Sequence, residues 1–306
     1  MLETTLCGVT LKNPVIAASG TFGFGAEYSE FFDVGKLGGI CTKGLTLHPR
    51  EGNPGLRVWE TPAGMMNSVG LQNPGIPVFL ERELPRMRTL GTAIIANVAG
   101  GDLEEYVEGV RLLSNADGVD IVELNISCPN VHEGGMAFGV NSDVAAGVVT
   151  AVRRVCSKPL MVKLSPNAED ITAMAIACEQ AGADAVSLVN TFKALAVDIH
   201  ARKPVFDNVT AGLSGPCIKP IALRMVWEVA RAVHIPVVGI GGISTWQDAV
   251  EFIMAGTTAV QVGTATFIKP TAMLDIIDGL ERYCANEHLT SLATVRNILG
   301  TEAPLP

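Results

Sequence analysis

The segment Val119-Asp-Ile-Val-Glu-Leu-Asn-Ile-Ser-Cys-Pro-Asn130 decides the fold assignment. Its first half is a β-branched, apolar run, which is typical of a strand buried on both faces of a parallel sheet. The run then turns polar at Asn125 and leads to Cys128, and Pro129 cannot continue a hydrogen-bonded ladder. The sequence therefore predicts a buried strand that ends in a loop carrying a thiol and two carboxamides, where catalytic groups are commonly found.

Seven further apolar runs indicate strands, and segments with apolar residues at helical spacing, such as Val144, Val148 and Val152, separate them. Eight strands that alternate with helices favour a single (β/α)8 TIM barrel over residues 1–306, and an open doubly wound sheet is the alternative. Residues 2–11 predict an N-terminal hairpin that turns at Cys7-Gly8 and caps the barrel. The expected strands are Pro14–Ser19, Gly39–Lys43, Ala93–Val98, Val119–Ile126, Leu160–Leu164, Ala185–Asn190, Val237–Ile240 and Ala259–Val262.

Long segments follow expected strands 2, 4 and 6. Gly44–Gly75 and Thr191–Pro216 are rich in glycine, proline and asparagine, which favours shaped loops over extra helices. Because the active sites of such barrels are built from the loops after the strands, we expect these two segments to wall a pocket. The segment Val131–Val140 contains Gly134-Gly135 and predicts a flexible lid over Cys128.

The composition excludes several classes of protein. The chain has 306 residues, 48% hydrophobic and 17% charged, with a net charge of −9, and this acidic balance argues against nucleic acid as a partner. No apolar run approaches the roughly 18 residues of a membrane span, and no signal peptide is visible, so we expect a soluble, cytoplasmic protein without a membrane partner. The seven cysteines form no Cys-x-x-Cys pair, and the histidines lack ligand spacing, so we expect no metal site, iron–sulfur cluster or disulfide framework in this chain.

Every expected strand finishes with a donor, an acceptor or a glycine. The glycines after strands 7 and 8, Gly241-Gly242 and Gly263-Thr264, predict a phosphate site, because bare backbone N–H groups can approach the oxygens there. Lys43 and Lys163 are costly to bury without an anionic partner, so each is a candidate for Schiff-base chemistry or for electrostatic stabilisation. Three asparagines at strand ends offer both hydrogen-bond donors and acceptors, which suits a ligand with a cyclic imide or urea edge. The glycines at 20–25 lack the spacing of a dinucleotide fingerprint.

With these motifs, the chain resembles the dihydroorotate dehydrogenases over essentially its whole length, and within them the class 1B catalytic subunits. The segments that carry the resemblance are Ala18-Ser-Gly-Thr-Phe-Gly-Phe-Gly25, Asn67-Ser-Val-Gly-Leu-Gln-Asn-Pro74, Asn125-Ile-Ser-Cys-Pro-Asn130, Val189-Asn-Thr191, Gly212-Leu-Ser-Gly-Pro216 and Gly239-Ile-Gly-Gly242.

The resemblance implies a barrel that binds FMN and oxidises (S)-dihydroorotate to orotate in pyrimidine synthesis, with Cys128 as the catalytic base. The implied FMN contacts are Ser19, Lys43, Gly44, Asn97, Asn125, Lys163, Val189, Gly215, Gly241, Gly242, Gly263 and Thr264. The implied substrate contacts are Lys43, Asn67, Ser68, Val69, Gly70, Leu71, Asn125, Asn130, Asn190 and Thr191.

This chemistry agrees with the residue types. The oxidation removes a proton from C5 of the substrate and transfers a hydride from C6 to N5 of the flavin. A cysteine with a reference pKa of about 8.5 can accept the proton near neutral pH, particularly where its surroundings favour thiolate. Lys163 would stabilise the anionic reduced flavin, and Lys43 could hold the substrate carboxylate.

The resemblance also indicates a subtype. The membrane-associated class has a serine base and an N-terminal extension. Because this sequence has Cys128, we expect neither such an extension nor quinone as the electron acceptor. The runs Ala18–Gly25 and Asp198–Pro204 resemble class 1B more than the fumarate-using class 1A. Class 1B implies a homodimer core in a heterotetramer, in which an electron-transfer subunit with FAD and a [2Fe–2S] cluster passes electrons to NAD⁺. The alternatives are a class 1A enzyme, another pyrimidine-reducing flavoenzyme, a flavin-free Schiff-base lyase or isomerase, and a non-catalytic binding barrel.

Overall fold

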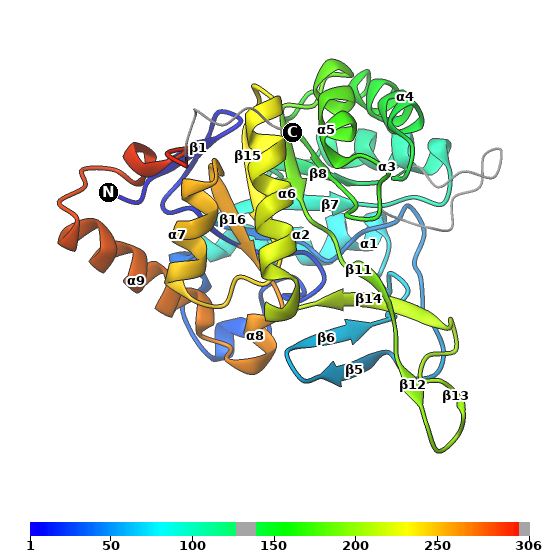
Figure 1. The fold of residues 1–306 in the computed structure, drawn as a ribbon. Helices are drawn as coiled ribbons and strands as arrows, with labels where there is room; N and C mark the ends of the chain where they lie inside the picture. Colours follow the sequence, from blue (N-terminus) through cyan, green and yellow to red (C-terminus); the bar gives the residue numbers. More distant parts are fainter. Residues whose placement is uncertain (127–138, 300–306) are drawn as a thin grey trace.

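The computed structural model describes residues 1–126 and 139–299, and within them eight parallel strands close into a barrel. The strands lie at the centre of the molecule and helices surround them (Figure 1). All eight expected strands are present and the expected closed barrel is confirmed, with neighbours in chain order around the ring. The barrel strands are β3 (Val15–Ala17), β4 (Gly39–Cys41), β7 (Ala93–Val98), β8 (Ile121–Asn125), β9 (Leu160–Lys163), β10 (Ala185–Leu188), β15 (Val237–Ile240) and β16 (Ala259–Val262).

Capping side chains fix where several outer helices begin. Asp102, Asn141 and Asp170 accept hydrogen bonds from the first-turn N–H groups of α3, α4 and α5, and Thr245 forms a capping box with Asp248 at the start of α7. The helices are α1 (Ile76–Val78), α2 (Leu84–Met87), α3 (Leu103–Ser114), α4 (Ser142–Arg153), α5 (Ile171–Gln180), α6 (Lys219–Ala232), α7 (Trp246–Met254), α8 (Ala265–Ile268) and α9 (Ala272–Asn286).

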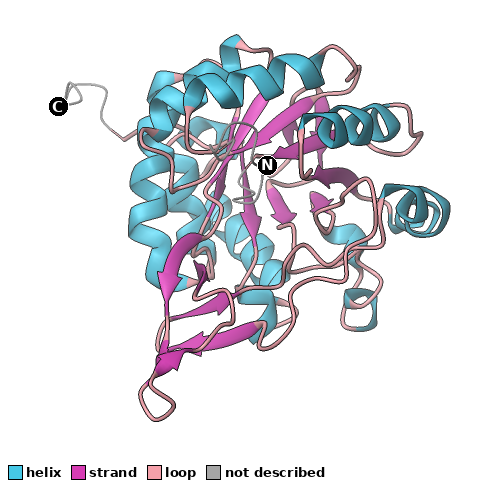
Figure 2. Ribbon diagram, turned by 90° about the vertical axis from the view of Figure 1, so that its right-hand side faces the viewer, coloured by secondary structure: helices cyan, strands magenta, loops and turns pink. Residues whose placement is uncertain are grey.

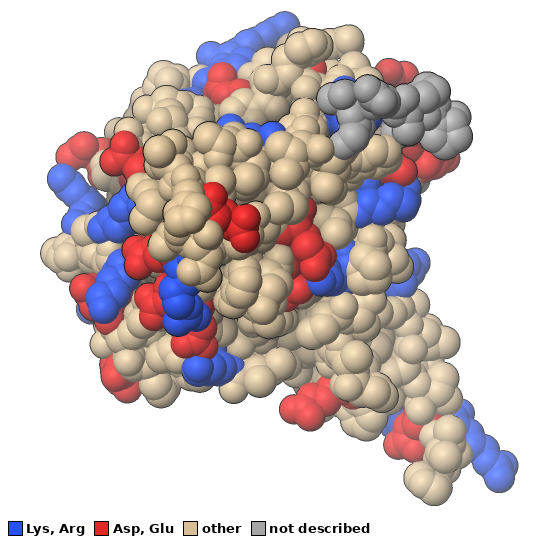
Figure 3. Space-filling view, turned by 60° about the vertical axis from the view of Figure 1, so that its left-hand side comes forward, with Lys and Arg blue, Asp and Glu red and all other residues tan. Residues whose placement is uncertain are grey.

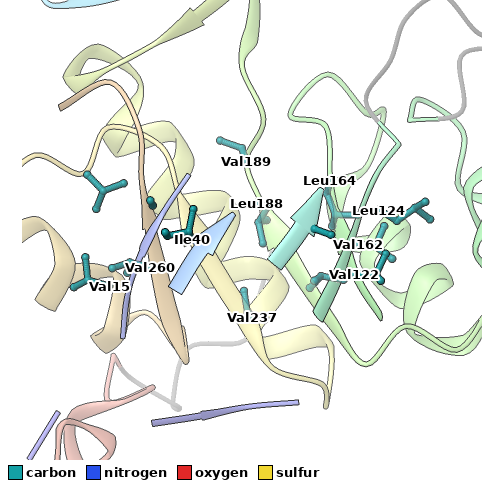
Figure 4. Packing of buried hydrophobic residues seen from close by; sticks show 14 of the residues in the cluster. Val15, Ile40, Val122, Leu124, Val162, Leu164, Leu188, Val189, Val237 and Val260 are labelled. Atoms are coloured by element: carbon teal, nitrogen blue, oxygen red, sulfur yellow. The ribbon is translucent and has the colours of Figure 1, made fainter. Parts of the chain in front are cut away.

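The largest hydrophobic cluster lies between the barrel and its helices. Outward-facing strand residues such as Val122, Leu124, Val162 and Val260 are fully buried in it, and Figure 4 shows them beside the strands that carry them. Because side chains alternate between the two faces of a strand, the residues between these positions point into the barrel. The β-branched runs of the sequence therefore reflect strands that are buried on both faces.

A second hydrophobic cluster fills the amino-terminal end of the barrel interior. Each barrel strand contributes one residue to it, namely Ile16, Cys41, Ile95, Ile121, Met161, Ala185, Val238 and Ala259. The expected hairpin, β1 (Thr4–Leu6) and β2 (Val9–Leu11), packs Leu6 and Leu11 against this layer, and both side chains are fully buried. Cys7 and Gly8 form its turn with positive φ angles. The hairpin is thus the apolar floor of the barrel.

The long segments after barrel strands 2 and 6 carry short strands as well as loops. They pair with each other in a four-stranded antiparallel sheet of order β11-β14-β6-β5. Its strands are β5 (Val58–Thr61), β6 (Gly64–Asn67), β11 (Phe192–Leu195) and β14 (Thr210–Ser214), and a small hairpin of β12 (Val197–Asp198) and β13 (Lys203–Pro204) extends beyond them. Figures 1 and 2 show this sheet to one side of the barrel. β5 and β6 form a local hairpin, but β6 pairs with β14 across a long separation in sequence, so no local signal in the sequence marks the whole sheet.

The surface carries both signs of charge. In Figure 3 acidic and basic side chains are interspersed over the visible face, and neither forms a continuous surface. Within residues 1–126 and 139–299, no helix is long and apolar enough to cross a membrane.

Candidate functional site

The interior of the barrel changes from apolar to polar two residues above its floor. Residues two apart on a strand face the same way, so the residue that follows each floor residue by two also points inward. On five strands that residue is polar and at most 5% exposed. These residues are Asn97, Glu123, Lys163, Ser187 and Gln261, on β7, β8, β9, β10 and β16.

Glu123 is the centre of this polar layer. Its Oε2 accepts hydrogen bonds from Cys41 Sγ at 2.8 Å and Asn97 Nδ2 at 2.7 Å, and its Oε1 accepts from Ser187 Oγ at 2.7 Å and Gln261 Nε2 at 2.8 Å. The side chain is fully buried, and an unpaired carboxylate there would be costly. Four donors from four other strands therefore hold one carboxylate under the barrel mouth.

The charge on Glu123 is stabilised by its surroundings. Burial alone raises the pKa of this carboxyl, but the positive charge of Lys163 and the hydrogen bonds from Cys41, Ser187 and Asn97 outweigh burial and hold the pKa below its usual range. Burial and the charge of Glu123 raise the pKa of the Cys41 thiol well above its ordinary value. Cys41 is therefore a protonated donor, and Glu123 and Lys163 form a buried pair of opposite charges.

A cluster of glycines meets at the carboxyl ends of β15 and β16. A Cβ on Gly242 would lie 2.9 Å from the carbonyl oxygen of Gly215, and a Cβ on Gly215 would lie 3.5 Å from Thr264 Cγ2. Gly215, Gly241 and Gly242 have positive φ angles, and the Thr264 hydroxyl donates to Ser214 Oγ at 2.8 Å. Backbone packed this closely leaves no room for side chains, which is the requirement of a site where N–H groups approach phosphate oxygens.

A set of carboxamides lies at the carboxyl ends of β8 and β10. Asn190 Nδ2 donates to Asn125 Oδ1 at 3.2 Å, and the Asn125 carbonyl oxygen accepts from Tyr106 Oη at 2.8 Å. Asn67, at the end of β6, pairs with Gly212 on β14, and a Cβ on Gly212 would lie 2.2 Å from Thr191 Oγ1. The antiparallel sheet therefore brings Asn67 and Thr191 to the strand ends of the barrel, next to Asn190.

The Asn67–Leu71 segment is held by the loop that precedes it. Asn53 Nδ2 donates to the Ser68 hydroxyl and carbonyl, both at 3.1 Å, and the Asn53 N–H donates to the Val69 carbonyl at 2.9 Å. Gly70 has a φ of +76°, and a Cβ there would lie 2.4 Å from Asn53 Oδ1. The next residue is Leu71, and its Cδ2 lies 3.3 Å from a Cβ built on Gly44. The segment thus connects the carboxamide set to strand β4.

Lys43 follows β4 and is half-buried. Its N–H donates to the Gly23 carbonyl at 3.0 Å. Burial, with a smaller contribution from the charge of Arg57, lowers the pKa of its ammonium group. An anionic ligand at the mouth would raise this pKa again.

The structure brings together the described members of the predicted site at the carboxyl ends of the strands. Cys128 and Asn130, and most of the expected lid Val131–Val140, lie outside the described residues. The sequence reasoning missed Glu123, Ser187, Gln261 and Cys41, since it considered only the last residues of each strand. The signal was available in the alternation of Ile121, Glu123 and Asn125, in which a charged residue shares the inward face with the predicted ligands.

FMN carries a phosphate and a ring edged with N–H and carbonyl groups, and the described residues fit both parts. The glycine cluster has the close backbone packing that a phosphate needs. The buried Asn97 Oδ1 has no hydrogen-bond partner within residues 1–126 and 139–299, and it lies 3.1 Å from a Cβ built on Gly44. An unpartnered acceptor at this position suits a ligand that donates a hydrogen bond to it. Among the same residues, no group of three or more His, Cys, Asp or Glu side chains could hold a metal ion.

Comparison with known proteins gives a consistent result. Residues 1–284 match the family model for dihydroorotate dehydrogenase. Three similar proteins each have the name dihydroorotate dehydrogenase B (NAD(+)), catalytic subunit. The protein of Petrotoga mobilis is 60% identical, with 98% of this chain and 100% of the relative covered. Those of Thermoanaerobacter pseudethanolicus and Bacteroides thetaiotaomicron are 52% and 50% identical, with 98% of both chains covered in each case.

Proposed function

The chain belongs to the dihydroorotate dehydrogenase family of flavin-dependent oxidoreductases, and from this we propose that it oxidises (S)-dihydroorotate to orotate on bound FMN in pyrimidine biosynthesis. The observation that supports the proposal most is the meeting of the glycine cluster, the carboxamide set and the Glu123–Lys163 pair at one end of the barrel. This end is where barrel enzymes carry their active sites.

The residues divide into two groups in this mechanism. Gly215, Gly241, Gly242, Gly263 and Thr264 would hold the FMN phosphate. Ser19, Lys43, Gly44, Asn97, Asn125, Lys163 and Val189 would contact the rest of the cofactor. When bound, FMN supplies the acceptor for two electrons.

The substrate is held and deprotonated by this chain's own side chains. Lys43 would pair with the substrate carboxylate, and Asn67, Asn125, Asn190 and Thr191, with Asn130, would fix the ring by hydrogen bonds to its N–H and carbonyl groups. Ser68, Val69, Gly70 and Leu71 would complete the wall on that side. Cys128 would take the proton from C5, and Lys163 would supply positive charge to the reduced cofactor.

We propose an anaerobic assay as the main test. The purified chain should be yellow, and its flavin absorbance should bleach when dihydroorotate is added without oxygen. A colourless chain that cannot be reconstituted with FMN would contradict the proposal and favour the Schiff-base alternative. Bleaching by dihydrouracil derivatives but not by dihydroorotate would indicate a different pyrimidine.

The relatives' names specify NAD(+) and a catalytic subunit, and this supports a partner. We propose a homodimer of this chain within a heterotetramer, whose electron-transfer subunits carry FAD and a [2Fe–2S] cluster. In the assay, the reduced chain alone should fail to reduce NAD⁺ and should do so once the partner is added. Rapid reoxidation by fumarate without a partner would instead indicate the class 1A type. The cytoplasmic location stays a prediction, which cell fractionation would test.

We predict that the affinity for orotate falls as the pH rises. The fall should begin at a lower pH than it would for a lysine with an ordinary pKa. Burial lowers the pKa of Lys43, and a bound carboxylate would raise this pKa again. At pH values between the two pKa values, orotate binding is therefore accompanied by the uptake of a proton. Above the lowered pKa, the Kd for orotate should rise by up to about tenfold per pH unit. Titration of flavin absorbance with orotate at several pH values measures this.

Lys43→Arg is the matched control for the pH effect, because a guanidinium stays charged throughout the range. Its Kd for orotate should be nearly independent of pH where that of the wild type rises. Equal slopes in the two proteins would show that another group causes the effect.

A further inference from the structure

Glu123 is a buried carboxylate that the proposed reaction does not use. It is fully buried, it lies two residues before Asn125 on β8, and it belongs to no part of the expected site. The simplest explanation is a structural polar layer, but such a layer can be built without an ionised group. The orientation of the side chains bound to it gives a more specific role.

The bond from Asn97 fixes which way that carboxamide points. An ionised carboxylate offers acceptors only, so Asn97 must present its Nδ2 to Glu123, at 2.7 Å. Its Oδ1 is then turned away from the carboxylate. This oxygen is buried, has no partner among the described residues, and lies 3.1 Å from a Cβ built on Gly44. Gln261 is oriented in the same way, with Nε2 on Glu123 and a buried Oε1 without a partner in the described part of the chain.

We propose that Glu123 is a positioning residue, which holds the Asn97 carboxamide so that its oxygen accepts a hydrogen bond from the bound cofactor. The role rests on the FMN site proposed above. If the amide were free to turn over, its NH₂ group would face the cofactor and the acceptor would be lost. A buried acceptor that is unsatisfied in the ligand-free chain destabilises it, and a ligand that donates to this acceptor removes that cost.

The charge of Glu123 is what makes this orientation definite. A glutamine at this position would offer both donors and an acceptor, and could pair with either orientation of the neighbouring amides. Lys163 supplies the compensating positive charge from the next strand, β9. Cys41 and Ser187 fill the remaining lone pairs, so the carboxylate cannot rotate to release Asn97 without losing other bonds.

A second-site rescue experiment on the two residues tests the proposal in the full-length chain. Asn97→Asp puts two carboxylates at hydrogen-bond distance, so one must be protonated or move, and the Kd for FMN should rise about tenfold or more. Adding Glu123→Gln gives the introduced carboxylate a donor again and keeps an acceptor toward the cofactor. The double variant should therefore recover FMN binding to within about threefold of the wild type. Quenching of FMN fluorescence on binding measures each Kd.

Two further variants separate positioning from folding. Cys178→Ala trims a fully buried side chain in α5, outside the polar layer, so it should lower the unfolding midpoint but leave the Kd for FMN within about twofold of the wild type. Asn97→Ala removes the acceptor itself and should raise the Kd about tenfold. It also serves as the comparison if Asn97→Asp does not yield folded protein.

The outcomes are distinct. Absence of rescue in the double variant, or a wild-type Kd in Asn97→Ala, would overturn the positioning role while the FMN site stands. A Cys178→Ala variant that loses as much affinity as Asn97→Ala would show that the loss follows from stability alone, and would also overturn it. A wild-type chain that binds no FMN would overturn the proposed function and this inference together.

Discussion

Replacing Cys128 by alanine is expected to slow reduction of the flavin by dihydroorotate by about 10²–10⁴-fold, because removal of a general base typically costs that much. FMN should remain bound, since none of the residues proposed to hold it is changed. Anaerobic stopped-flow measurement of flavin bleaching gives the rate, and the absorbance of the purified variant gives the FMN content.

Cys284→Ala is the matched control for this change. It replaces a thiol by a methyl group at a fully buried position in α9, away from the strand ends. The variant should lose some stability and keep the wild-type rate of flavin reduction. A Cys128→Ala variant that reduces its flavin as fast as Cys284→Ala would show that another group takes the proton.

The second large effect is expected for Gly241→Ala. Gly241 has a φ of +126°, and a Cβ there would lie 2.7 Å from Ala222 Cβ on α6 and 3.2 Å from Val189 Cγ2. Backbone strain and overpacking together should lower the free energy of unfolding by about 2–5 kcal/mol. Because Val189 and Gly241 are both proposed cofactor contacts, FMN binding should weaken as well. Denaturant unfolding and FMN titration measure the two effects.

Gly8→Ala separates strain from the steric contact. Gly8 also has a positive φ, +82°, but a Cβ there would meet nothing within 4 Å. The variant should lose only about 1–2 kcal/mol for its backbone conformation and should bind FMN normally. Equal losses of unfolding free energy in the two variants would mean that the contact with Ala222 adds nothing to the cost of the backbone conformation.

The fold was predictable because its strands are buried on both faces. Val119–Ile126 and the other apolar runs are marked by burial itself, and the number of strands then favours a closed barrel. The antiparallel sheet was not predictable in the same way. Its strands are half-exposed, and β6 pairs with β14 across a long separation in sequence, so local pattern carries little information about the pairing.

Only the candidate site residues at the ends of the strands were predictable from the sequence. Asn125, Asn190 and the glycines at strand ends are recognisable because polar or flexible residues interrupt apolar runs. Glu123 lies inside such a run, and its role depends on partners from four other strands, as its bonds to Asn97 and Gln261 illustrate. The alternation of Ile121, Glu123 and Asn125 indicates an inward-facing charge, but only the three-dimensional arrangement shows which side chains this charge orients.

The apolar floor limits the routes by which substrate, product and protons can enter or leave the barrel. Leu6 and Leu11 close the amino-terminal end with side chains that offer no hydrogen bonds to water. In the part of the chain that the structure describes, this layer offers a proton no hydrogen-bonding groups, and it separates Glu123 and Lys163 from the amino-terminal end. Substrate entry, product exit and proton release therefore share the mouth at the carboxyl ends of the strands. Any partner that covers the mouth controls all three at once.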